Sequence, residues 1–281
     1  MGGNEESLVF TCEGEELVGI IHQPKKPSGL GVLLVVGGPQ YRVGSHRQFV
    51  TLARYLAEQG VTVFRFDYRG MGDSAGPMQD FEQAGADIKA ATDVFLEHES
   101  NLTSLTLWGL CDAASAICFY ASQDARINNL VLLNPWVRTE QGESKVFLKD
   151  YYLKRFFSKA FWQKIMSGDV NVMASTKSLS EKVLGVFKKE REPKKQGLLP
   201  LPDRVLNSLG KYTHPILFIF SGKDLTAKEF IHLVETDVKG QALMTQANVS
   251  RVDLPDSDHT FSRDEWKTQV NVATLGWLKA L

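Results

Sequence analysis

The chain has little of what membrane, secreted and zinc-binding proteins require. No stretch of its 281 residues approaches the roughly 18 consecutive apolar residues that cross a bilayer. The opening residues, MGGNEES, are acidic and lack the apolar core of a signal peptide. There are only three cysteines, and neither they nor the histidines show a zinc-ligand spacing. We therefore expect a cytoplasmic protein, and the sequence implies no metal.

Excess charge of one sign is also absent. The 32 Lys and Arg residues are balanced by 33 Asp and Glu residues, which leaves a net charge of −1 at pH 7. This balance gives no indication of a nucleic-acid partner. The composition is 43% hydrophobic and 23% charged, which is typical of a globular chain that buries a large core.

Short apolar runs recur along the chain, and helical patterns lie between them. Consecutive Val, Ile, Leu and Phe residues are typical of parallel strands covered on both faces. The alternation predicts an α/β fold with a mostly parallel, doubly wound sheet of about eight strands. The expected strands are 7–12, 15–21, 31–36, 61–66, 105–108, 129–133, 216–220 and 250–254, and the expected helices are 47–59, 81–97, 113–122, 227–235 and 264–280.

One long segment, residues 138–212, breaks this alternation. It has no strand pattern, and glycines and prolines interrupt its helix formers. We expect a helical lid inserted between two parts of the core, 1–137 and 213–281, at the sheet edge where ligands bind. Within it, residues 145–195 hold 13 Lys and Arg against five Asp and Glu, together with many aromatic residues. Two interpretations stay open: helices that pack over the site, or a basic surface that touches anionic membrane or a lipid-linked substrate.

Cys111 stands at the most informative position of the chain. The strand pattern at 105–108 leads into Gly109-Leu110-Cys111-Asp112-Ala113, and a helix pattern follows. This order matches the G-x-S-x-G nucleophile elbow, with Cys in place of Ser and Ala in place of the last Gly. Such a turn exposes the side chain, and the helix N-terminus beside it favours the thiolate. The alternatives are a cysteine that only packs in the core, and Ser115, which lies one helical turn further on.

Three further motifs follow other expected strands. They are GGPQ at 37–40, DYRGMGDS at 67–74, and a late pair, SGKD at 221–224 with DSDHTF at 256–261. Over nearly its whole length the chain resembles the α/β-hydrolase superfamily, whose members carry nucleophile, acid and histidine in this order. More narrowly, residues 37–49 and the cysteine elbow resemble the hydrolases associated with bacterial exosortase A systems.

The resemblance implies a Cys-His-Asp triad. His259 would be the general base toward Cys111 and then the acid toward the leaving group. Asp224 would hold the imidazole tautomer, and it is favoured because it follows the strand after the insertion. A plain loop histidine is the alternative for His259. The acids that compete with Asp224 are Asp253, Asp256 and Asp258.

The oxyanion site is less complete. The backbone N–H of Asp112 would supply one donor. The second donor often follows the two glycines, but that residue is Pro39, which has no N–H. Gln40, through its N–H or its side-chain amide, is the expected substitute. Gly38 and Arg42 are expected to line the substrate site, where Arg42 either meets an anionic group or is solvated.

Three functions are compatible with these residues. The first is an acyl hydrolase of the esterase or thioesterase type, which acts on a small-molecule acyl substrate through a covalent acyl-enzyme without a cofactor. The second is an acyltransferase that modifies a saccharide or lipid-linked acceptor. The third is a hydrolase-like binding protein without activity, to which Pro39 and the Ser-to-Cys change point. The sequence does not indicate an oligomeric state.

Overall fold

The structure is a computed structural model, and it describes residues 4–38, 40–138 and 198–281. Contacts divide the chain into two units, Met1–Val137 with Pro202–Leu281, and Arg138–Leu201. The expected insertion at 138–212 falls mostly outside the described residues, and its function as a lid stays a prediction. Its last part, from Pro202 onward, belongs to the first unit.

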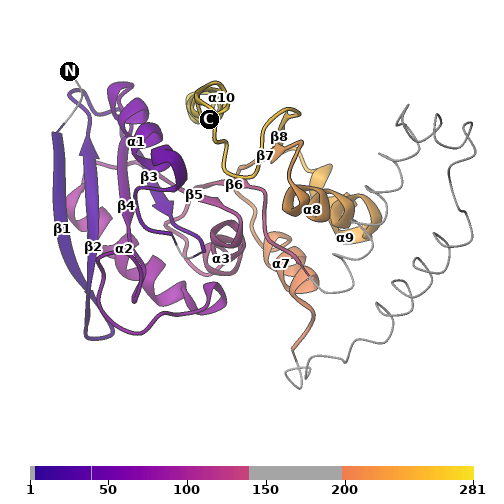
Figure 1. Cartoon of the computed structure of the whole chain (residues 1–281), viewed down its shortest axis with the longest axis horizontal. Helices are drawn as coiled ribbons and strands as arrows, with labels where there is room; N and C mark the ends of the chain where they lie inside the picture. The colour runs from indigo at the N-terminus through magenta and orange to yellow at the C-terminus, as the bar shows by residue number, and fades with distance from the viewer. Residues whose placement is uncertain (1–3, 39, 139–197) are drawn as a thin grey trace, which may run out of the picture. The chain divides into compact units, whose positions relative to one another are not determined.

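The first unit is built on one eight-stranded sheet with the order β1-β2-β4-β3-β5-β6-β7-β8 (Figure 1). Strand β2 pairs antiparallel with both β1 and β4, whereas all later neighbours are parallel. The predicted mostly parallel α/β sheet is confirmed. The strands are β1 Asn4–Cys12, β2 Glu15–Gln23, β3 Leu30–Val35, β4 Thr62–Phe66, β5 Ser104–Leu110, β6 Asn129–Leu133, β7 Ile216–Ser221 and β8 Val249–Leu254.

Helices cover both faces of this sheet (Figure 1). Helices α1 and α10 pack together on one face, and α2 and α3 pack together on the other. The described helices are α1 Gln48–Glu58, α2 Gly85–His98, α3 Asp112–Ala121, α7 Leu201–Leu209, α8 Leu225–Thr236, α9 Val238–Met244 and α10 Asp264–Leu278, with 3-10 turns at Ser45–Arg47 and Phe81–Gln83. None of the helices in the described ranges is both long and apolar enough to cross a membrane.

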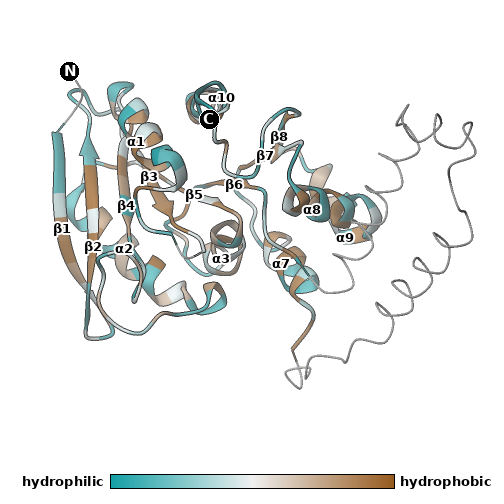
Figure 2. Cartoon of the chain, in the orientation of Figure 1, coloured by the Kyte–Doolittle hydropathy of each residue, from teal (hydrophilic) through white to brown (hydrophobic). Residues whose placement is uncertain are grey.

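The core follows from the two-residue period of the strands. In β3, Val32 and Leu34 face α1 and α10 within one buried cluster. On the opposite face, Phe230 of α8 packs its ring against Phe218 and Phe220 of β7. Figure 2 shows the hydrophobic residues gathered along the inner strands and hydrophilic ones on the exposed side of α10. The inner strands β3 to β7 are therefore buried on both faces, as their continuous apolar runs predict.

Two helix expectations need correction. The pattern at 81–97 predicts one helix, but the chain forms a 3-10 turn at Phe81–Gln83, and α2 begins only at Gly85. The Asp80 carboxylate caps that turn by accepting the Glu82 N–H, which gives the turn a start of its own. Helix α9 was not expected, because seven residues are too few for a clear helical period.

Candidate active site

Cys111 forms a sharp turn between β5 and α3. Its backbone lies at φ 64° and ψ −125°, in a region that costs a side-chain-bearing residue of order 1–3 kcal/mol. Hydrogen bonds on both sides hold this turn: the Cys111 N–H donates to Leu133 O at 2.9 Å, and the Trp136 N–H donates to Cys111 O at 3.1 Å. The half-buried thiol is thereby lifted off the strand at the start of α3.

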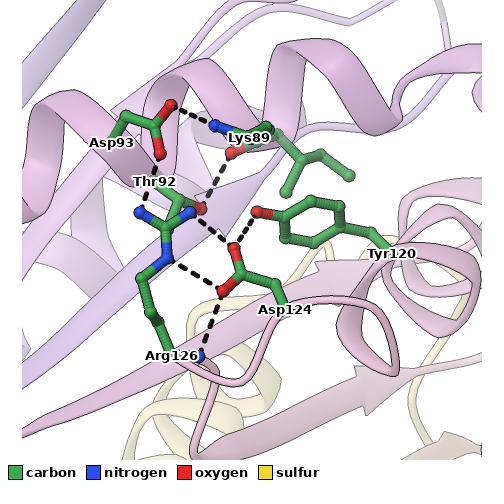
Figure 3. Close-up of polar contacts among 7 residues, drawn as sticks. Lys89, Thr92, Asp93, Tyr120, Asp124 and Arg126 are labelled. Atoms are coloured by element: carbon green, nitrogen blue, oxygen red, sulfur yellow. Dashed lines mark hydrogen bonds and ion pairs between the residues drawn. The ribbon is translucent and has the colours of Figure 1, made fainter.

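Helix α3 is fixed at both of its ends. At the elbow, a Cβ on Gly109 would lie 3.0 Å from Ala113 C and 3.1 Å from Ala114 N of the α3 backbone, so the absence of a side chain favours the close approach of β5 and α3. Beyond the far end, Arg126 donates to Asp124 of the following turn and to Asp93 of α2 (Figure 3). The Tyr120 hydroxyl of α3 also donates to Asp124. These polar contacts connect the C-terminal end of α3 and the turn after it to α2.

His259 lies on the loop after β8 and contacts Asp224 on the loop after β7. The His259 Nδ1 and Asp224 Oδ2 atoms are 2.8 Å apart. The buried Asp224 carboxylate also caps α8, because Oδ1 accepts the Thr226 N–H and Oδ2 accepts the Ala227 N–H, both at 3.1 Å. Helix α8 therefore fixes the carboxylate, and the carboxylate orients the imidazole.

The thiol of Cys111 forms the other contact of the imidazole. Burial lowers the pKa of His259, but the hydrogen bonds to Asp224 and Cys111 and the negative charges of both groups outweigh it. The result is a pKa raised to about 10. The imidazole of His259 is therefore protonated at neutral pH, and it lies between the Asp224 carboxylate and the Cys111 side chain.

The competing carboxylates point elsewhere. Asp253 pairs with Arg251, and Asp256 pairs with Lys223. Asp258 accepts hydrogen bonds from the N–H and hydroxyl of Ser262. Ser115 is buried, and its hydroxyl donates to Trp136 O at 2.6 Å, away from the imidazole. Among the described residues, Asp224 is thus the acid that contacts His259.

The side chains of the two oxyanion candidates, Asp112 and Gln40, accept hydrogen bonds in the structure, and the function of their N–H groups as oxyanion donors stays a prediction. The side chain of Asp112 accepts the Gly38 N–H on Oδ2 at 2.8 Å and the Ala113 N–H on Oδ1 at 3.0 Å. Burial raises the pKa of this carboxyl, whereas these N–H groups and the nearby His259 lower it. The Gln40 side chain accepts the Ser45 N–H on Oε1 at 3.2 Å. Pro39 lies outside the described residues.

The guanidinium of Arg42 is held by two carboxylates of the same chain. Its guanidinium donates to the fully buried Asp67 and, at 2.7 Å, to Asp73. Two carboxylates thus neutralise the charge that an anionic substrate would need, and they raise the pKa of Arg42 although burial lowers it. Arg42 is therefore ion-paired with the DYRGMGDS turn and not simply solvated, and its expected contact with a substrate stays a prediction.

Asn134 supports the site, and sequence analysis missed it. It is fully buried at the end of β6 with φ 44°, a left-handed conformation that asparagine tolerates. Its amide donates to Ser221 Oγ at 2.9 Å and to His259 O at 3.4 Å, and its Oδ1 accepts the Ser221 N–H at 2.9 Å. Asn134 thereby joins the ends of β6 and β7 to the histidine loop. The sequence feature that could have indicated Asn134 is an Asn-Pro pair directly after a buried strand, because such a pair favours a turn.

Within the ranges that the structure describes, no three or more His, Cys, Asp or Glu side chains are placed to hold a metal ion.

Comparison with known proteins identifies the fold and the family of the chain. The chain is similar in structure to an esterase of Pyrococcus furiosus, with a TM-score of 0.67 at 15% identity, covering 99% of this chain and 91% of the esterase. An α/β hydrolase, GrgF, from a Penicillium species gives a TM-score of 0.64 at 16% identity, with 99% and 98% covered. These likenesses establish the α/β-hydrolase fold. No curated protein sequence matches the chain significantly.

A family model matches residues 32–191, which is more than half of the chain and includes Cys111. The family is described as a serine aminopeptidase family, whereas this chain carries cysteine at the elbow. The chain belongs to this hydrolase family, serine aminopeptidase S33.

Proposed function

We propose that the protein is an acyl hydrolase of the esterase or thioesterase type that acts through Cys111, His259 and Asp224. The contact of His259 with both Cys111 and Asp224, at the end of a strained strand–turn–helix elbow, is the observation that carries the proposal. Membership of a hydrolase family supports it.

The reaction follows from these contacts. The Cys111 thiolate attacks the carbonyl carbon, and the electron pair of the C=O bond moves to oxygen. When the oxyanion collapses, the leaving group departs with the proton of the His259 imidazolium, and a thioester on Cys111 remains. Neutral His259 then takes a proton from water as the oxygen adds to the thioester. A second collapse releases the acid and restores the thiolate–imidazolium pair, while Asp224 stabilises the imidazolium.

Intact-protein mass spectrometry tests this directly. A short activated ester such as p-nitrophenyl acetate should add one acyl group to the wild type and none to Cys111→Ala. In His259→Ala the adduct should persist, because no base activates water. Cys118→Ala is the matched control: the Cys118 thiol is buried, donates to Ala114 O and has a raised pKa, so its loss should not alter labelling. Labelling that survives in Cys111→Ala contradicts the proposal.

An acyltransferase is the second candidate, and it shares the acyl-enzyme. Its support is the similarity of residues 37–49 and the cysteine elbow to exosortase A system-associated hydrolases, from which we also infer a bacterial protein of that narrower group. Addition of a polyol or saccharide alcohol should then speed turnover and yield an acylated acceptor, whereas a hydrolase yields only free acid. A peptide-like aminoacyl amide belongs in the same substrate series, because the family description names a peptidase.

Other features stay proposals. A cytoplasmic location is in keeping with three free cysteines, Cys12, Cys111 and Cys118. Contact of the basic segment at 145–195 with anionic lipid rests on its composition alone. A catalytically inactive binding protein is the remaining alternative, and it predicts no adduct with any ester and no effect of Cys111→Ser on ligand binding.

A further inference from the structure

The side chain of Asp112 joins the two segments from which an oxyanion site would be built. One segment is the elbow, where Asp112 begins α3 and accepts the Ala113 N–H. The other is the turn after β3, where the same carboxylate accepts the Gly38 N–H at 2.8 Å. A single side chain thus sets the distance between the loop and the nucleophile turn.

The sequence makes room for this contact at Gly37. A Cβ at this position would lie 2.2 Å from Asp112 Oδ1, 2.8 Å from Ala113 N and 2.9 Å from Leu110 O. Ala113 N and Leu110 O are backbone atoms, so they cannot move away by a side-chain rotation. Gly38 itself has φ 61°, a conformation that side-chain-bearing residues rarely adopt. Both glycines are therefore required by a loop that presents its N–H to the carboxylate.

This contact decides which N–H groups can meet an oxyanion. The Gly38 N–H is occupied by Asp112, and Pro39 has no N–H to offer. The next N–H along the loop is that of Gln40, which has no acceptor among the described residues. The side-chain Oε1 of Gln40 is already held by the Ser45 N–H.

We propose that Asp112 is a positioning residue that holds the Gly37–Gly38 turn against the elbow and thereby leaves the Gln40 N–H as the second oxyanion donor. The inference deepens the proposed acyl transfer to Cys111 and rests on it. The carboxylate acts through the loop and touches no reacting atom. A neutral amide at residue 112 can still accept the Gly38 N–H, so Asp112→Asn should keep most of the effect that Asp112→Ala removes.

Two reactions of the same thiol separate this positioning from a change in the nucleophile. Alkylation by iodoacetamide forms no oxyanion, whereas acylation by p-nitrophenyl acetate does. Loss of an oxyanion donor costs about 10²–10³ in rate, so Asp112→Ala should slow acylation by roughly that factor and change alkylation by no more than about threefold. Asp112→Asn should restore acylation to within about tenfold of the wild type.

Asp237→Ala is the matched control. The Asp237 carboxylate also accepts two backbone N–H groups at a helix start, those of Lys239 and Gly240. Its loss removes a helix cap without touching the site, so acylation and alkylation should both stay at wild-type rates. An equal fall of both rates in Asp112→Ala would overturn the proposal, since Asp112 would then act on the Cys–His pair.

Hydrogen exchange at the Gly38 amide tests the same contact without any substrate. The amide should exchange at least about tenfold faster in Asp112→Ala than in the wild type, because its acceptor is gone. Unchanged exchange overturns the inference whether or not an ester reacts. A wild type that is alkylated but never acylated refutes the proposed function instead, and the exchange experiment still decides the role of Asp112.

Discussion

Replacement of Asp224 by asparagine is the sharpest test of the charge arrangement at the site. Asparagine is as good a helix cap as aspartate, so α8 keeps its start while the negative charge disappears. The pKa of His259 is raised from its ordinary value of 6.5 to about 10, although burial acts in the opposite direction. Asp224 and Cys111 supply that increase by hydrogen bonding and by charge.

The size of the effect follows from the distance. Opposite unit charges about 4 Å apart attract by about 4 kcal/mol at an effective dielectric constant of about 20, and each 1.36 kcal/mol is about one pKa unit. Because Cys111 contributes too and the ring is partly exposed, we expect Asp224→Asn to lower the pKa of His259 by about two units. The rate of acylation should also fall by about 10²–10⁴, since the amide does not enforce the tautomer.

The stabilisation of the fold by His259 decreases as the pH rises. The folded pKa of His259 lies above the unfolded value, so its contribution to stability is complete below pH 6.5 and is lost as the pH rises to about 10. The protonated imidazole of His259 should likewise persist in the wild type to about pH 10 and be lost about two units lower in Asp224→Asn. NMR titration of the His259 ring measures both values.

Asp256→Asn is the control for this titration, because Asp256 lies three residues before His259 but pairs with the exposed Lys223. It should leave the pKa of His259 unchanged. A His259 pKa in Asp224→Asn within about half a unit of the wild type would refute the assignment of Asp224 as the acid.

Three further changes probe the scaffold around the site. Asn134→Ala should destabilise the protein by about 2–4 kcal/mol in urea unfolding, because it leaves buried polar groups of β7 and the histidine loop without partners; a change below about 1 kcal/mol would contradict this. Gly37→Ala should abolish acylation, whereas Gly85→Ala, whose Cβ meets nothing within 4 Å, should be neutral or slightly stabilising; equal activity of the two variants would refute the steric argument. Arg126→Ala should lower the melting temperature at pH 7, because the hydrogen bond from Arg126 lowers the folded pKa of Asp124 and so stabilises the folded protein while that carboxyl is charged. This stabilisation is lost as the pH falls, so the substitution should have little effect below the unfolded pKa of Asp124. A loss of melting temperature that is the same at pH 7 and at pH 3 would contradict this prediction.

The inner strands could be predicted from the sequence because they are runs of apolar residues covered on both faces. Residues 31–36 and 129–133 were expected to be strands for this reason, and the strands found there, β3 and β6, lie in the middle of the sheet. The elbow could be predicted as well, since a glycine, a small following residue and a strand-to-helix change all occur around Cys111. Helix boundaries were harder, because the break near Gly85 depends on a local cap rather than on the hydrophobic period.

The contacts of polar side chains could not be predicted in the same way. An arginine such as Arg42 can bind an anion, but here Asp67 and Asp73 neutralise its positive charge. These two residues lie 25 and 31 positions away in the sequence. The carboxylate of Asp112 gives no sign in the sequence that it accepts the Gly38 N–H, 74 positions earlier. These hydrogen-bond partners become neighbours because the sheet brings the ends of different strands together. A local sequence pattern does not predict such contacts.

Asp112, Asp224 and Asp237 each place a carboxylate at the start of a helix, and the further contacts of these carboxylates differ. Each carboxylate accepts at least one backbone N–H of its helix, which fixes its orientation: one N–H for Asp112 and two each for Asp224 and Asp237. Asp237 makes only capping contacts. Asp224 and Asp112 each use a further contact to hold another segment, His259 in one case and Gly38 in the other. Alanine at 224 or 237 removes a helix cap, whereas alanine at 112 removes only one contact to α3, the hydrogen bond to the Ala113 N–H. Only at 112 and 224 does alanine also release a segment of the site, so the large losses of acylation should occur at these two positions.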